Sequence, residues 1–183
     1  GLDTYRYFEG HQYLRHWICM PLVVGITERQ QDTLVALFDS LWTDDGIRVE
    51  LNPDPEVARV FWDRGTLYAF RGAFYGGATE RGMGRLKQFS RKRLLGDRVP
   101  YVVEAYPEGG MAHLSAESGL YCRVFTEGLL GIKPTGFDSF ELLPRLPGDW
   151  PEYTLRRIHA FGRIWDVTLR RDGPGDSIQI EID

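Results

Sequence analysis

Apolar residues recur at helical spacing through roughly the first 130 positions of the chain. Five of them between residues 11 and 24 predict a helix, and Pro21 is expected to kink or end it. The clearest pattern covers residues 27–41, where Leu34, Leu37 and Leu41 share one face and Thr27 with Gln30 matches a capping box. Because only a couple of residues join these two helices, we expect them to form an antiparallel hairpin.

A second pair of helices is predicted over residues 66–75 and 80–95, on either side of Gly76 and Gly77. A loop rich in Asp, Asn and Pro precedes this pair at residues 44–55. Further along, Ser115 can cap another helix, which should end at Gly131. Up to that residue, every regular element that the pattern predicts is helical.

The pattern changes at Thr135 from helical spacing to β-favouring runs separated by Pro and Gly. The runs cover residues 140–143, 153–160, 164–169 and 178–182, and the last two alternate between apolar and polar positions. The expected class is therefore mainly α with a β tail. We divide it into helical hairpins over residues 1–133 and a small antiparallel β unit over residues 134–183.

The composition of the chain excludes some classes of function but adds little to the predicted fold. The 183 residues include 22 Lys and Arg against 26 Asp and Glu, a formal net charge of −4, so a nucleic-acid partner is not expected. No apolar run approaches the roughly 20 residues of a membrane span, so no membrane partner is expected. Aromatic residues make up 13% of the chain, which suits both an aromatic core and a site that stacks on sugar rings.

Two cysteines, Cys19 and Cys122, lie within apolar helical patterns and are expected to remain free thiols. The histidines His11 and His16 are five residues apart, which is not the spacing of a helical metal pair. We therefore expect no metal and no organic cofactor. These residues do not indicate in which cellular compartment the protein is found.

One carboxylate, Glu104, has unusual neighbours within residues 99–132. On an extended segment, Val102, Glu104 and Tyr106 alternate onto one face, which places the carboxylate between an apolar side chain and a phenol ring. Such surroundings can tune a base. The alternative is a solvated surface glutamate with no role in chemistry.

The order of short motifs resembles the C-terminal end of a six-hairpin glycosidase of the glucoamylase-like superfamily. The motifs are Phe-Trp-Asp-Arg-Gly at residues 61–65, Glu-Ala-Tyr-Pro-Glu-Gly at 104–109, Leu-Ser-Ala at 114–116 and a β tail that begins near residue 140. The resemblance covers most of the chain from about Thr27 onward. It implies helical hairpins of a partial α/α toroid around a sugar pocket.

The resemblance also implies roles for individual residues. Glu104 occupies the place of the general base of an inverting glycoside hydrolase, which activates water across the sugar ring from a carboxylic acid roughly 6.5–9.5 Å away. Trp62, Arg64 and Gly65 match the Trp-Arg-Gly element that lines the pocket, with Asp63 inserted. Trp62 and Tyr68 would form a platform for the sugar.

Three further residues complete the predicted site. Tyr106 and His113 are expected to contact the carbohydrate substrate. Glu9 is the only candidate named for the general acid, and a charge that favours the dipole of the next helix is its ordinary explanation. In the resembling enzymes the acid comes from an earlier hairpin, so a preceding part of the same enzyme is the expected partner. The same dipole argument covers Glu117, in the first turn of a helix.

Two alternatives stay open at this point. A phosphorylase of the same architecture would use phosphate in place of the activated water. A non-catalytic carbohydrate-binding or interaction fragment would bind sugar without cutting it, and its unburied hairpin faces would require a partner.

Overall fold

Strands occur throughout the chain in the computed structural model, which describes residues 2–95, 105–106, 116–173 and 175–183, with the backbone alone at 105–106. The described chain is 42% helical and 22% strand. The predicted class, mainly α with a β tail built on a partial α/α toroid, is therefore wrong. The chain is a mixed α and β protein in which two small antiparallel sheets interrupt the helical part.

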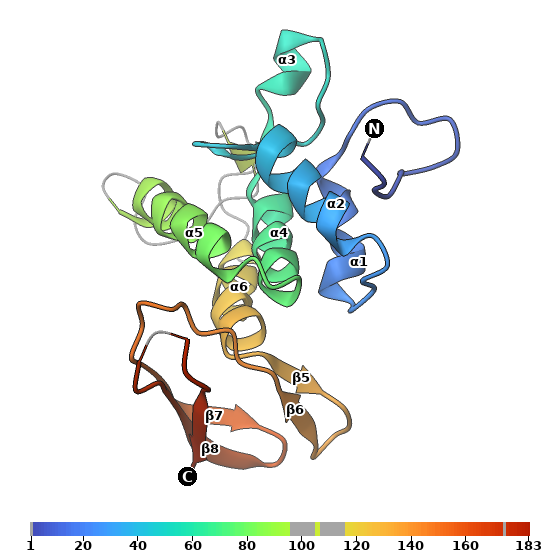
Figure 1. The fold of residues 1–183 in the computed structure, drawn as a ribbon. Helices are drawn as coiled ribbons and strands as arrows, with labels where there is room; N and C mark the ends of the chain where they lie inside the picture. Colours follow the sequence, from blue (N-terminus) through green and yellow to red (C-terminus); the bar gives the residue numbers. More distant parts are fainter. Residues whose placement is uncertain (1, 96–104, 107–115, 174) are drawn as a thin grey trace.

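Helix α4 (Asp63–Tyr75) lies at the centre of the molecule (Figure 1). On one side of it are α1 (Met20–Val23) and α2 (Gln30–Val35), and on the other is α5 (Thr79–Leu94). Its apolar residues Leu67, Phe70 and Phe74 have no exposed surface. A helix that is apolar on several sides is one that other elements cover. Because α4 is buried among the other elements, the segments at its two ends are fixed relative to the centre of the fold.

Most of the other helices contact α4, whereas α3 lies apart from it (Figure 1). In chain order the helical elements are η1 (His16–Cys19), α1 (Met20–Val23), α2 (Gln30–Val35), the π-helix η2 (Ala36–Leu41), α3 (Pro55–Ala58), α4, α5 (Thr79–Leu94), α6 (Ala116–Arg123) and the π-helix η4 (Val124–Leu129). The predicted helices over 66–75 and 80–95 are confirmed as α4 and α5. The helix predicted from residue 11 begins only at His16, and the helix predicted from residue 27 begins at Gln30.

The capping box predicted at Thr27 and Gln30 is wrong. The N-cap of α2 is Arg29, and no side chain caps that helix. The Gln30 side chain instead donates a hydrogen bond to the carbonyl of Gly76, at the end of α4 (3.1 Å). A contact between two helices has replaced the local one.

Four short strands lie within the helical part. Strand β1 (Trp42–Thr43) pairs with β2 (Gly46–Ile47), and β3 (Phe61–Trp62) pairs with β4 (Ala105–Tyr106), both antiparallel. An isolated bridge from Arg48 to Phe61 joins the residue after β2 to β3, and a second isolated bridge pairs Arg15 with Glu50. These two-residue strands owe their existence to pairing across the fold, so no periodic pattern in the sequence marks them.

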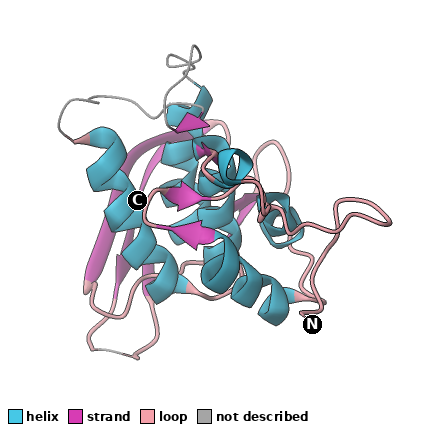
Figure 2. Ribbon diagram, turned by 90° about the horizontal axis from the view of Figure 1, so that it is seen from above, coloured by secondary structure: helices cyan, strands magenta, loops and turns pink. Residues whose placement is uncertain are grey.

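The β tail has its own sheet and its own apolar core. Strands β7 (Glu152–Ala160), β8 (Arg163–Arg170) and β9 (Gln179–Ile182) form one antiparallel sheet, beside the hairpin of β5 (Ile132–Pro134) and β6 (Phe140–Leu142). A second apolar cluster, which includes Leu130, Trp165 and Leu169, is separate from the one around α4. Figure 2 shows this sheet on the opposite side of the helices from the N-terminal loop.

Two smaller expectations can also be compared with the structure. Both cysteines are free, as predicted; Cys19 is buried, and Cys122 lies at the surface of α6. Within the described ranges, none of the helices is long and apolar enough to span a bilayer.

Candidate functional site

A cluster of four rings surrounds the N-terminus of α4. The indole of Trp62 lies 6.5 Å from that of Trp17 and 5.9 Å from the imidazole of His16, measured between ring centroids. The phenol of Tyr68, one turn into α4, lies 6.0 Å from Trp17. Of the four, only His16 is fully buried. The two residues predicted as a sugar platform, Trp62 and Tyr68, therefore both contact Trp17.

Gly65 lets His16 approach the first turn of α4. A Cβ atom at residue 65 would lie 2.2 Å from Cδ2 of His16 and 2.5 Å from its Nε2, far inside contact distance. Only glycine leaves this space. The glycine of the Trp-Asp-Arg-Gly segment thus serves packing against an imidazole.

The electrostatic state of His16 follows from its surroundings. Nδ1 donates a hydrogen bond to the carbonyl of Val49 (2.9 Å), which leaves the lone pair on Nε2. Burial lowers the pKa of His16 to about 4, although the bond to Val49 acts in the opposite direction. The ring is therefore neutral at pH 7 and fixed in one tautomer.

A buried ion pair joins α4 to α6. Nε and Nη2 of Arg64 both bind Oε1 of Glu117, at 2.8 and 2.7 Å. The Glu117 side chain has no exposed surface, whereas that of Arg64 is 34% exposed. Within the described part of the chain, Oε2 of Glu117 is buried without a hydrogen-bond partner. Glu117 thus holds one edge of a guanidinium that still reaches the surface.

The pairing of β3 with β4 brings two of the motif segments side by side. Phe61 pairs with Tyr106 and Trp62 with Ala105. Ala105 directly follows Glu104 in the sequence. Segment 61–65 is therefore joined to the glutamate-bearing segment by strand pairing and to the helix after Leu-Ser-Ala by the Arg64–Glu117 pair.

A second buried ion pair anchors the same end of α4 to α5. Nε of Arg93 contacts both carboxylate oxygens of Asp63, at 3.1 and 3.0 Å, and the side chains of the two residues are 1% and 0% exposed. Arg93 also donates to the backbone carbonyl of Asp45. Asp63, the residue inserted into the Trp-Arg-Gly element, therefore has a structural role that the sequence did not suggest.

The other predicted site residues divide into two groups. Glu104 and His113 lie outside the described residues, and of Tyr106 only the backbone is described. Glu9 is exposed in a turn closed by a hydrogen bond from His11 N to Phe8 O (3.1 Å). No contact among the described residues joins Glu9 to Trp62 or Arg64.

Sequence reasoning missed His16 and Glu117. A glutamate in a first helical turn resembles an ordinary dipole contact, and only the fold places it against Arg64.

No group of three or more His, Cys, Asp or Glu side chains in the described ranges could hold a metal ion. No known protein family matches the chain, and a search of curated proteins found no related sequence.

Proposed function

We propose that the chain contributes the general base and sugar-binding residues of a glycoside hydrolase site, centred on Trp62, Arg64 and Glu104. One observation supports this function most. The three segments singled out by the resemblance, 61–65, 104–109 and the helix after 114–116, are linked by the β3–β4 pairing and by the Arg64–Glu117 ion pair. Segment 61–65 is distant in the sequence from the other two, so these two links are not a consequence of chain proximity.

The proposed reaction is the hydrolysis of an O-glycosidic bond with inversion. Glu104 accepts a proton from water while the water oxygen forms a bond to the anomeric carbon. The bond from that carbon to the leaving oxygen breaks, and a carboxylic acid protonates this oxygen. Because Glu9 is exposed and has no contact with the ring cluster, we leave the acid unassigned.

The described residues would bind and orient the sugar. The half-buried rings of Trp62 and Tyr68 offer apolar faces to a pyranose ring. Arg64, which Glu117 holds at Nε and Nη2, places a partly exposed guanidinium beside these rings. Tyr106 and His113 keep the substrate-binding roles that the resemblance implies.

The test is a comparison of Glu104→Gln with Glu108→Gln, the same change four residues further along the same segment. Release of reducing sugar would be measured from α- and β-linked gluco-, manno- and galacto-oligosaccharides, with and without phosphate. We expect E104Q to lose a factor of about 10²–10⁴ in turnover and E108Q to keep it, with unchanged melting temperatures. Full turnover by E104Q would refute the assignment.

The same assay separates the two alternatives. Formation of sugar phosphate only when phosphate is present would indicate a phosphorylase. Saturable sugar binding without cleavage under any condition would indicate a non-catalytic binding protein.

A further inference from the structure

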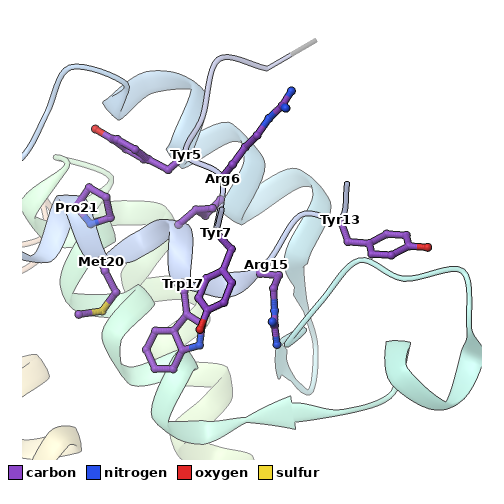
Figure 3. Close-up of a pocket in the computed structure, with 9 residues that line it drawn as sticks. Tyr5, Arg6, Tyr7, Tyr13, Arg15, Trp17, Met20 and Pro21 are labelled. Carbon is purple, nitrogen blue, oxygen red and sulfur yellow. The ribbon is translucent and has the colours of Figure 1, made fainter. Parts of the chain in front are cut away.

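A cavity of about 470 Å³ lies between the N-terminal segment and the η1–α1 helices. This volume falls in the range of small-molecule sites, roughly 300–1,000 Å³. Tyr5 and Tyr7 line it from the N-terminal segment, and Trp17, Met20 and Pro21 line it from the helices (Figure 3). Its walls are therefore mostly flat aromatic and apolar surfaces.

Contacts with α2 hold the N-terminal wall in place. The hydroxyls of Thr4 and Thr33 are hydrogen bonded at 2.9 Å. Nη1 of Arg29 donates to the carbonyl of Thr4 (3.1 Å), and its guanidinium lies 5.6 Å from the ring centroid of Tyr5. A wall fixed before the ligand arrives reduces the ordering cost of binding.

The ring of Tyr7 is held in a similar way, although it is 59% exposed. The guanidinium of Arg15 lies 5.1 Å from its centroid, within the range of a cation–π contact. Oε2 of Glu50 lies 3.4 Å from Nε of Arg15 and balances its charge. The Tyr7 ring is therefore both exposed and held in place by a neighbouring cation.

The cavity adjoins the candidate site through Trp17. This indole lines the cavity and also contacts Trp62 and Tyr68, at 6.5 and 6.0 Å between centroids. A ligand in the cavity would therefore lie next to a sugar bound on the Trp62 platform.

The charges around the cavity favour a neutral ligand. Arg15 is already paired with Glu50. The guanidinium of Arg6, the other basic residue of the lining, points away from Tyr7 and Trp17 in Figure 3. Neither cation is therefore directed at a carboxylate or sulfate placed between the rings.

We propose that this cavity binds a neutral hexopyranose unit of an oligosaccharide, by stacking of the sugar's apolar face on Tyr7 and Trp17. Phenol hydroxyls at the edges of the cavity can bond to the sugar's own hydroxyls. The proposal of a sugar-binding site depends only on the geometry of the cavity. Its assignment as a subsite next to the catalytic site rests on the proposed function, and under that function the substrate is an oligosaccharide.

Phe8 supplies a matched control for the test. Like Tyr7 it is 59% exposed, and the two rings are neighbours, 6.1 Å apart, but Phe8 does not line the cavity. Both variants, Tyr7→Ala and Phe8→Ala, would be made in the Glu104→Gln background, which under the proposed function cannot consume the probe. Binding of cellotriose, maltotriose, mannotriose and trigalacturonate would be followed by tryptophan emission, because Trp17 lines the cavity.

We expect saturable binding of at least one neutral trisaccharide. Y7A should weaken it about tenfold or more, whereas F8A and Tyr7→Phe, which keeps the ring, should change it less than about threefold. Because Tyr7 is largely exposed, the melting temperature of Y7A should stay within about 2 °C. Failure of every neutral probe, a preference for trigalacturonate, or equal effects of Y7A and F8A would overturn the proposal.

Failure of the proposed function has a different signature. If E104Q still hydrolyses sugars but Y7A alone weakens binding, the cavity is a sugar site and the role of Glu104 is wrong. If E104Q is inactive and Y7A binds normally, the hydrolase assignment stands and the cavity proposal is wrong.

Discussion

Replacing His16 with Phe should remove a specific part of the pH dependence of stability. His16 has no exposed surface, and its Nδ1–H donates to the carbonyl of Val49. That carbonyl also accepts from the backbone N–H of His16 (3.2 Å), so it keeps one partner in the variant. Phe has a similar ring and does not titrate.

The magnitude follows from the pKa. Burial lowers the pKa of His16 from 6.5 to about 4, so between these values the unfolded chain binds a proton that the folded chain does not. Stability from this group is therefore complete above pH 6.5 and is lost as the pH falls toward 4. The full effect is about 3 kcal/mol, of which about 2 kcal/mol is lost at pH 5.

The assay is urea unfolding of both proteins from pH 7 to pH 4.5. Carboxylates titrate in both, so the difference in unfolding free energy between wild type and H16F isolates the imidazole. At pH 7 the variant should be less stable by about 1 kcal/mol, because it lacks the side-chain hydrogen bond. At pH 5 the order should be reversed. Parallel pH curves would show that His16 is not buried in its neutral form.

Three further substitutions test the packing around α4 and in the sheet. Gly65→Ala would place a methyl group 2.2 Å from His16, so we expect a loss of about 3 kcal/mol in urea unfolding and a shift in tryptophan emission. Glu127→Ala would leave Arg71, whose side chain is 5% exposed, without its ion-pair partner, and should lower stability by roughly 3 kcal/mol; an unchanged urea midpoint would contradict the pair. Arg157→Gly should raise stability by about 1 kcal/mol, since Arg157 has a left-handed φ of 56° that glycine adopts without strain, and a lower thermal midpoint would argue against this.

The sequence predicted the long elements well because many residues share each periodic pattern. Helices α4 and α5 and strands β7 and β8 follow the predicted ranges within a few residues. The tight turn between the two strands uses Phe161 and Gly162, both with positive φ, as a two-residue hairpin requires.

The fold class was wrong because short strands have no pattern of their own. Strands β1 to β4 contain two residues each and form through tertiary pairing. The first helix was predicted too long for a related reason. Residues 14 and 15 belong instead to a ladder in which the N–H of Leu51 donates to Leu14 O (2.8 Å) and Arg15 pairs with Glu50.

The candidate site was predictable only in part. Trp62, Arg64 and Tyr68 could be named from the sequence and all lie at the start of α4. His16 and Glu117 could not, because each becomes notable only through a contact with a residue distant in the sequence. Glu104 and His113 lie outside the described residues, so their roles stay predictions.

The most direct test of the proposed function is the anomeric configuration of the first product, followed by proton NMR during hydrolysis of a cleaved oligosaccharide. A general base at Glu104 that activates water predicts a first product of inverted configuration, formed by the wild type and absent with E104Q. A first product of retained configuration would contradict the account, because a carboxylate would then act as a nucleophile and not as a base.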